Sequence, residues 1–111
     1  MLRSDLWAAA FVRRHNDIGE ICVVSRRGDA IAGQIFIEID HLNGTVSLLV
    51  PAPSSALAEN EEDHVFVRRF DHGDPRTVQE RIAREVAFDP DLWLLSLETR
   101  ASDIGVNLVE N

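Results

Sequence analysis

The 111-residue sequence contains no lysine, a single cysteine and no long hydrophobic run. One cysteine cannot form an intramolecular disulfide, which is typical of a protein from a reducing compartment. A membrane-spanning helix needs roughly 20 consecutive apolar residues, and no segment approaches that length. The apolar run at residues 6–12 is too short for the core of a signal peptide and follows an acidic residue. These absences predict a soluble, cytoplasmic protein that has no membrane partner.

The charge balance is acidic: the formal net charge is −8 at pH 7, and all eleven basic residues are arginine. Proteins that bind nucleic acid need a net basic surface to neutralise phosphate groups, so we do not expect a nucleic-acid partner. A compositional bias of the source genome explains the missing lysine better than a function does. A chain of this length forms one domain, residues 1–111, because it has no room for a second core.

Residues 20–53 are predicted to form two consecutive β-hairpins at the centre of the fold. In the second hairpin, isoleucine occupies every second position from 35 to 39, which is the period of a half-buried strand. Asn43-Gly44, between this run and the apolar run at 46–50, is a strong signal for a two-residue type I′ turn. Such a turn places four apolar residues on one buried face, with Ile39 opposite Leu48 and Ile37 opposite Val50.

Two helices are predicted from their end signals. Ser4 is the candidate N-cap of the first helix, and the polar residues at 16–19 end it. Asp74 is the candidate N-cap of the second helix, with Pro75 at its first position. This helix must end by Phe88, because a proline two residues further on keeps the residue before it out of the helical region.

The remaining segments predict strands on either side of the second helix. The strands are expected at Ile21–Arg26, 33–40, 46–50, 65–70 and 92–99, and the pattern allows a short sixth strand at 106–109. The acidic stretch at 54–64 is predicted to be an exposed loop. The order α-β-β-β-β-α-β predicts an α+β fold with two helices and an antiparallel sheet of about five strands.

Both faces of the predicted sheet carry large apolar residues. Either the two helices cover both faces, or one face contacts a second copy of the chain. From this pattern we predict a homodimer.

Several short motifs are spread over nearly the whole chain. They are Leu6-Trp7 followed by Arg13-Arg14, Arg26-Arg27-Gly28-Asp29-Ala30 with Gly33, Leu42-Asn43-Gly44-Thr45, Pro51-Ala52-Pro53 and Phe88-Asp89-Pro90-Asp91-Leu92-Trp93. In these motifs the sequence resembles the bacterial domain of unknown function 1491 family, and the last motif is the most specific. The resemblance implies a small bacterial protein, in agreement with the cytoplasmic prediction. It brings no established activity, cofactor or catalytic residue to this chain.

No motif for catalysis or metal binding is present. The four histidines lack the paired spacing of a zinc site. Asp71-His72-Gly73-Asp74 could supply oxygen and nitrogen ligands to a metal, but a turn followed by an N-cap explains this segment better. Cys22, in an apolar strand, is interpreted as packed core and not as a nucleophile. No metal and no cofactor are therefore predicted, and the sequence argues against an enzyme.

Two pairs of carboxylates also have a structural and a functional interpretation. Glu38 and Asp40 project from one face of a strand, about 7 Å apart, a separation that acid–base chemistry could use. Exposed acidic residues on the solvent face of a strand are far commoner. Asp89 and Asp91 could form part of a ligand site, but we interpret them as a rigid corner that directs Trp93 into the core.

The turn between the first two strands is the place where a ligand is predicted, at Arg26, Arg27, Gly28, Asp29 and Gly33. Two guanidinium groups beside the N–H groups of glycines would favour a phosphate or carboxylate. A simpler explanation is that the arginines pair with Asp29 or with the acidic stretch. The favoured hypothesis is therefore a small non-catalytic interaction module that self-associates, and the alternative is a small-anion binding protein or enzyme that uses this turn.

Overall fold

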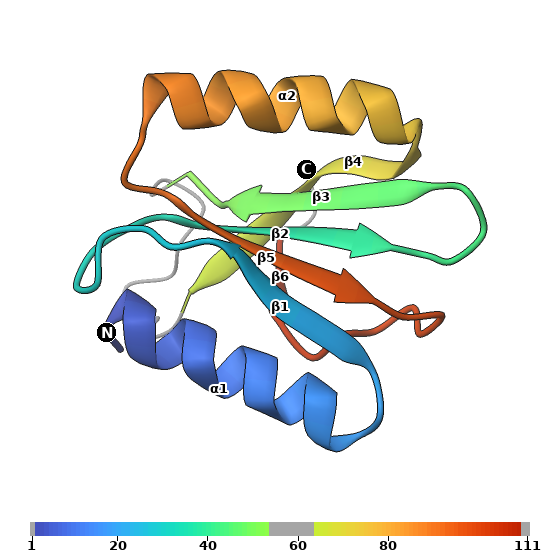
Figure 1. Cartoon of the computed structure of the whole chain (residues 1–111), viewed down its shortest axis with the longest axis horizontal. Coiled ribbons are helices and arrows are strands. Elements are labelled where there is room, and N and C mark those ends of the chain that lie inside the picture. The colour runs from blue at the N-terminus through green and yellow to red at the C-terminus, as the bar shows by residue number, and fades with distance from the viewer. Residues whose placement is uncertain (1, 54–63, 110–111) are drawn as a thin grey trace.

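The computed structural model describes residues 2–53 and 64–109. The acidic stretch predicted to be a loop lies outside these residues, except for His64. Within the described ranges the chain forms two helices and six strands (Figure 1), and their bounds in chain order are α1 (Ser4–Asp17), β1 (Ile21–Arg26), β2 (Ile35–Asp40), β3 (Val46–Pro51), β4 (Val65–Gly73), α2 (Pro75–Phe88), β5 (Trp93–Glu98) and β6 (Asn107–Leu108). Neither helix is long and apolar enough to cross a membrane.

The six strands form one mixed sheet in the order β1-β5-β2-β3-β4-β6. The α+β class is confirmed, but the prediction of an antiparallel sheet of about five strands is wrong. The pairs β2–β5 and β4–β6 are parallel, and the other three pairs are antiparallel. The first predicted hairpin is absent because β5 lies between β1 and β2. Sequence-local signals could not show this, since β5 follows β2 only after β3, β4 and α2.

The second predicted hairpin exists, but its turn is longer than two residues. The loop spans residues 41–45, and His41 N–H donates to the carbonyl of Thr45 at 3.1 Å. The side chains of Asp40 and Asn43 accept the N–H groups of Leu42 and Thr45, respectively, at 2.8 and 3.0 Å. These bonds stabilise the wider loop and compete with the tight type I′ turn.

The longer loop moves the strand pairing by one residue. Ile37 lies opposite Leu49, and Ile39 lies opposite Ser47. Because side chains alternate between the two faces of a strand, a shift of one residue exchanges the faces of one partner. Leu48 and Val50 therefore belong to a different core cluster from Ile37 and Ile39.

One helix covers each face of the sheet, as Figure 1 shows with α2 above and α1 below. On the α1 face, Ala8 and Phe11 pack among buried residues that include Ile35, Ile37 and Trp93. On the α2 face, buried residues from the helix and four strands form a second cluster, which includes Val78, Ile82, Phe36, Leu48, Val67 and Leu94. Each large apolar side chain buried in this way contributes about 1.5–3 kcal/mol. The apolar residues of β2, β3 and β5 are thus buried within one chain, whereas Ile21 and Val23 of β1 are exposed.

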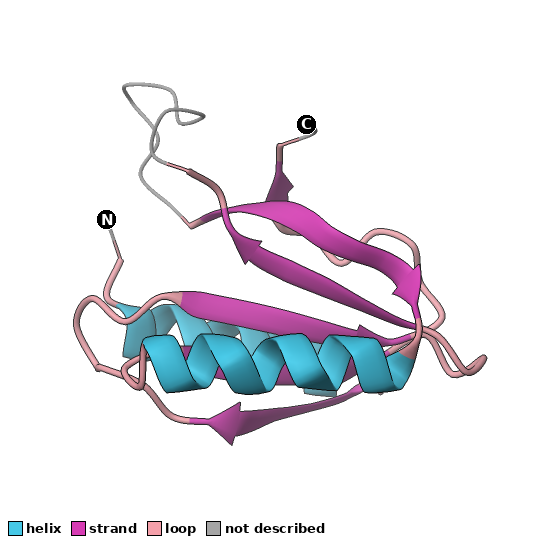
Figure 2. Cartoon of the chain, turned by 90° about the horizontal axis from the view of Figure 1, so that it is seen from above, coloured by secondary structure: helices cyan, strands magenta, loops and turns pink. Residues whose placement is uncertain are grey.

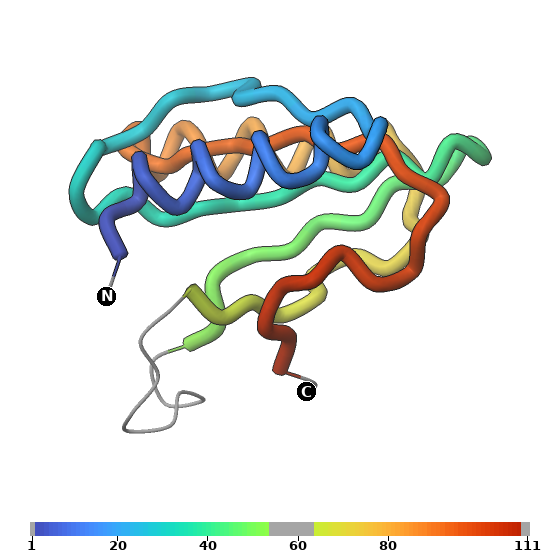
Figure 3. Tube along the Cα trace, turned by 90° about the horizontal axis from the view of Figure 1, so that it is seen from below, coloured from blue at the N-terminus to red at the C-terminus, as the bar shows by residue number. Residues whose placement is uncertain are grey.

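The two helix starts differ from each other. Asp74 caps α2 as predicted, because its carboxylate accepts the N–H of Thr77 at 3.0 Å, and the helix ends at Phe88. Ser4 is not the cap of α1: it is the first helical residue, and its hydroxyl donates to the carbonyl of Gly33 at 2.6 Å. In Figure 3 the segment between β1 and β2 passes beside this end of α1. There the carbonyl of residue 30 accepts the N–H of residue 5 at 2.9 Å, so the segment satisfies a free helix donor.

Candidate functional site

A groove of about 320 Å³ opens on the α2 face of the sheet, beside the start of that helix. It is lined by three carboxylate residues, Glu38, Asp40 and Glu98, and none of the described residues that line it is basic. In Figure 2, α2 lies in front of the middle of the sheet, and β1 lies to one side of the helix. The helix has its closest backbone contacts with β3 and β4, and side chains of β1 on this face, such as Val23, remain exposed.

The parallel pairing of β2 and β5 brings the carboxylates together. In this register Asp40 lies beside Glu98, and Glu38 lies beside Ser96. The sequence analysis identified Glu38 and Asp40 as one carboxylate pair, and the structure places both in the groove. It missed Glu98, because only knowledge of the β2–β5 pairing connects that residue to them.

Glu38 is the most constrained of the three acids. One of its carboxylate oxygens accepts the side-chain amide of Gln79 at 2.7 Å, and the other accepts the hydroxyl of Ser96 at 2.6 Å. The hydroxyls of Ser25 and Ser96 are 2.5 Å apart, which extends the chain of hydrogen bonds to β1. The half-buried carboxylate therefore has a fixed position and no cationic partner among these contacts.

Apolar side chains border the acidic centre on the side of β1. Ile21 is 58% exposed and Val23 is 50% exposed, and both line the groove together with Pro75 at the start of α2. Apolar side chains next to each other on a surface, with a polar centre beside them, are typical of a contact surface. The groove thus offers both negative charge and apolar area to a ligand.

Ser96, in the groove, is not arranged as a serine nucleophile. The hydroxyl of Ser96 contacts a carboxylate and another hydroxyl, and neither is the imidazole base that activates a serine nucleophile. Across residues 2–53 and 64–109, no group of three or more His, Cys, Asp or Glu side chains has an arrangement that could hold a metal ion.

The turn predicted to bind an anion packs against the Asp-Pro-Asp-Leu-Trp segment. Arg26 donates to the carbonyl of Pro90 at 2.8 Å, and the Arg27 guanidinium lies 4.9 Å from the centre of the Trp93 ring. The ring nitrogen of Trp93 donates to the carbonyl of Asp29 at 2.7 Å. Arg26 and Arg27 therefore contact Pro90 and Trp93, and neither of these partners is an acidic residue that the simpler explanation named. The Nε atom of Arg26 is buried and has no hydrogen-bond partner among the described residues.

The backbone and the carboxylate of this turn are engaged as well. Gly33 N–H donates to the carbonyl of Asp29 at 3.2 Å, and Asp29 N–H donates to the carbonyl of Asp91 at 2.9 Å. The Asp29 carboxylate accepts two N–H groups of its own turn, from Ile31 at 3.2 Å and from Ala32 at 2.9 Å. These contacts connect the β1–β2 segment to the corner before β5.

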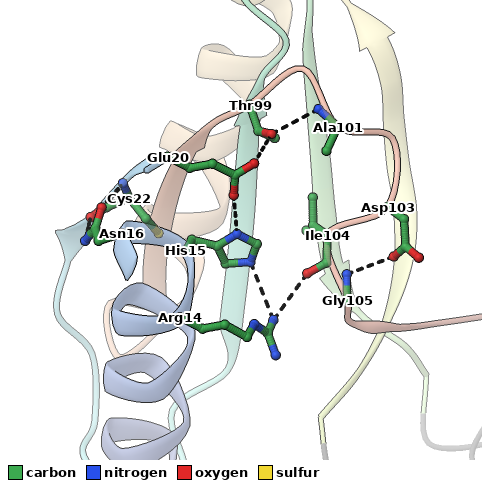
Figure 4. A network of polar contacts seen from close by, with 10 residues as sticks. All are labelled: Arg14, His15, Asn16, Glu20, Cys22, Thr99, Ala101, Asp103, Ile104 and Gly105. Atoms are coloured by element: carbon green, nitrogen blue, oxygen red, sulfur yellow. Dashed lines mark hydrogen bonds and ion pairs between the residues drawn. The ribbon is translucent and has the colours of Figure 1, made fainter. Parts of the chain in front are cut away.

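A second polar network connects the end of α1 to the segment after β5 (Figure 4). The carboxylate of Glu20 contacts His15 Nδ1 at 2.5 Å and also accepts the hydroxyl of Thr99. Hydrogen bonds from Thr99 and His15 hold the pKa of Glu20 below its ordinary range. Arg14 contacts the other ring nitrogen of His15 at 3.5 Å and donates to the carbonyl of Ile104 at 3.2 Å.

The order of groups in this network does not match a nucleophile triad. In a triad the histidine lies between the hydroxyl and the carboxylate, whereas here the carboxylate of Glu20 lies between Thr99 and His15. Both His15 and Thr99 are buried, at 4% exposure each. We interpret the network as a connection that fixes α1 to the segment between β5 and β6.

The histidine and aspartate considered as metal ligands lie at the far end of β4. His72 contacts the Asp71 carboxylate at 2.7 Å, and its ring stacks on His41 with centroids 3.7 Å apart. Burial lowers the pKa of His41, and the charge of His72 lowers it further. Ser47 accepts the N–H of His72 at 3.0 Å and contacts His41 Nε2 at 2.7 Å. Because Ser47 is only 2% exposed, its hydroxyl has no access to a substrate.

Comparison with known proteins places the chain among bacterial relatives. The model of a family described as "Protein of unknown function (DUF1491)" matches residues 2–106. A crystal structure of a DUF1491 family protein from Caulobacter crescentus is 24% identical, with a TM-score of 0.80, and the match covers 98% of this chain and 100% of that one. A solution structure of a protein from A. tumefaciens is 29% identical, with a TM-score of 0.84, and the match covers 99% and 96% of the two chains. No protein with curated annotation matches significantly. The predicted resemblance is confirmed, and the chain belongs to the DUF1491 family of proteins of unknown function.

Proposed function

We propose that this protein is a non-catalytic interaction module that binds a basic, amphipathic segment of a partner protein in the acidic groove. The observation that carries the proposal is the composition of the groove. Three carboxylates and two exposed aliphatic side chains line one surface, and no described lining residue is basic, although the chain has eleven arginines. Arginine and lysine side chains of a partner would meet the carboxylates, and its apolar side chains would cover Ile21 and Val23.

The backbone groups at the β1 edge of the sheet indicate how the partner segment lies. Asn16 forms two hydrogen bonds with the backbone of Cys22, one to its carbonyl and one from its N–H, both at 2.9 Å. The side-chain amide thus occupies the position that an added strand would take at this part of β1. We therefore expect the partner to lie across the sheet face and not to extend the sheet.

The proposal is tested with a synthetic amphipathic peptide of arginine and leucine, whose binding is followed by amide shifts in NMR spectra. A peptide with glutamate in place of each arginine is the control ligand. We expect the basic peptide to move the amides of β1, β5 and the start of α2, with an affinity that falls as salt is added. Equal binding of the acidic peptide would refute the electrostatic argument.

A matched pair of variants separates the groove from the overall acidity of the chain. Glu38→Gln combined with Glu98→Gln removes two charges from the groove, and Asp17→Asn combined with Glu80→Gln removes two charges elsewhere on the surface. The first variant should weaken binding by about tenfold, because each exposed charge pair contributes up to about 1 kcal/mol. If both variants weaken binding equally, the peptide does not recognise the groove.

Three sequence-based predictions stay predictions: self-association as a homodimer, a cytoplasmic location, and anion binding at Arg26–Gly33. The apolar pattern that suggested a dimer is explained by the two helices, so a dimer would need another contact surface. The exposed side chains of β1 are the best candidates for it. For the anion site, the Nε atom of Arg26, which is buried without a hydrogen-bond partner among the described residues, would have to become accessible to the ligand.

A further inference from the structure

We propose that a second site, separate from the acidic groove, binds a small organic anion with an apolar body. The site is a cleft of about 430 Å³ between α2 and the ends of β2 and β3, with β4 at its side. Its volume lies in the range of known small-molecule sites, roughly 300–1,000 Å³. Two arginines and one glutamate line it, so its local charge is positive in a chain whose net charge is −8.

Arg81 supplies an oriented guanidinium group. Its Nε atom donates to the Glu85 carboxylate at 2.8 Å, one helical turn further along α2, and the side chain is 30% exposed. This contact uses one edge of the guanidinium and leaves the two terminal nitrogens without a bond to any described side chain. A carboxylate or phosphate group accepts two parallel hydrogen bonds from such an end.

Arg69 supplies the second cation from β4. Its side chain lines the same cleft, and this side chain makes no hydrogen bond or ion pair within the described parts of the chain. This distinguishes it from Arg26 and Arg27, whose guanidinium groups contact Pro90 and Trp93. The cleft therefore offers guanidinium donors beside an apolar lining, whereas at the predicted turn the unpartnered Nε atom of Arg26 is buried.

The apolar side of the cleft determines the rest of the ligand. Phe36 and Val50 contribute to its lining and are 4% and 8% exposed, and Ala52 and Pro53 extend it beyond the end of β3. Gln34, just before β2, adds an amide that can donate or accept. A bare inorganic ion would use the arginines alone, whereas a carboxylate on a ring or short chain would use both sides.

The experiment is a titration of the full chain with benzoate, followed by amide shifts in NMR spectra. Benzamide, which has the same ring without the charge, and inorganic phosphate, which has the charge without the ring, are the comparison ligands. We expect benzoate to move the amides of Phe36, Val50 and Ala52 at lower concentration than either comparison ligand does. Benzamide binding equally well would overturn the role of the arginines, and phosphate binding equally well would overturn the role of the apolar lining.

Two charge-removing variants locate the site. Arg69→Gln should weaken benzoate binding about tenfold or more, because a hydrogen bond to a charged group contributes about 1.5–3 kcal/mol, which corresponds to that factor. Arg84 lies on α2 but does not line the cleft. Arg84→Gln should therefore change the affinity for benzoate by no more than about twofold. An equal loss in both variants would show attraction to surface charge in general, and shifts confined to Arg26–Gly33 would move the anion site back to the predicted turn. Either result would overturn the proposal. The acidic groove has no part in this titration, so its proposed function stands or fails independently.

Discussion

Gly28 is the position where a single methyl group should have the clearest effect on stability. A Cβ atom there would lie 2.2 Å from the carbonyl oxygen of Asp91 and 2.6 Å from the carbonyl carbon of Leu92. Both are backbone atoms at the corner before β5, so no side chain can rotate away. The φ angle of Gly28 is not in the left-handed region, and the conflict is therefore one of space and not of backbone conformation.

The Gly28→Ala variant should unfold at lower temperature than the wild type. Extra atoms forced into a packed site cost about 1–3 kcal/mol, and for a chain of this length each kcal/mol lowers the melting temperature by about 4 °C. We therefore expect a decrease of about 4–12 °C in a thermal unfolding curve.

Gly73→Ala is the matched control for this prediction. A Cβ atom on Gly73 would have its nearest contact at 3.6 Å, to the ring of Phe70, which is an ordinary packing distance. We expect this variant to keep or slightly raise the melting temperature, since alanine restricts the unfolded chain more than glycine does. If Gly28→Ala and Gly73→Ala have the same melting temperature, the stability of the fold does not depend on close contact between the β1–β2 segment and the corner before β5.

Three further measurements test other parts of the structure. Trp93→Ala should cost about 3–5 kcal/mol, since the side chain is 1% exposed, and an unchanged melting temperature would contradict its place in the core. Burial raises the pKa of Cys22 to about 11, so a thiol reagent at pH 8 should modify it slowly in the folded protein and rapidly in urea, whereas rapid modification of the folded protein would show an accessible thiol. Sedimentation at micromolar concentration should detect the predicted homodimer, and a monomer under these conditions would exclude it.

The elements of this fold could be predicted from the sequence because their signals are local. Asp74 and Pro75 mark the start of α2, and Phe88 marks its end. Each of these signals acts within one or two helical turns. The predicted strand at 92–99 contains β5 for the same reason, since the alternation of apolar residues requires only the strand itself.

The strand pairing could not be predicted, because it depends on contacts between distant segments. The segment between β1 and β2 was interpreted as a hairpin turn, yet it packs on the corner at residues 89–92 and leads the chain past β5. The Asn43-Gly44 signal competed with the side chains of Asp40 and Asn43, which bond the loop N–H groups. The propensity of Asn-Gly for a type I′ turn does not determine the loop conformation when such side-chain hydrogen bonds favour a longer loop.

The candidate site shows the same limit. Glu38 and Asp40 could be found from the sequence because they alternate along one strand, but Ser96 and Glu98 join them only through the parallel β2–β5 register. The cleft around Arg81 is harder still to predict from the sequence, since it combines a helix position with the ends of two strands. Charge and polarity identify candidate residues in a sequence, and tertiary pairing decides which of them meet.

The network around Glu20 gives a prediction for the pH dependence of stability. Hydrogen bonds from Thr99 and His15 hold the pKa of Glu20 below its ordinary value of 4.5. A carboxyl group whose pKa is lower in the folded chain stabilises the fold above its unfolded pKa, and this contribution disappears as the pH falls through the folded pKa. Glu20→Gln should therefore be less stable than the wild type at pH 7 in urea unfolding. Glutamine carries no charge and has one acceptor oxygen, so it cannot replace both carboxylate contacts, with His15 and Thr99. The difference should shrink as the pH falls below about 4.5.

Asp103→Asn is the control, since asparagine keeps an oxygen for the Gly105 N–H that Asp103 accepts at 2.8 Å. A Glu20→Gln deficit that stays constant down to the acid transition would show that the carboxylate charge does not stabilise this end of α1.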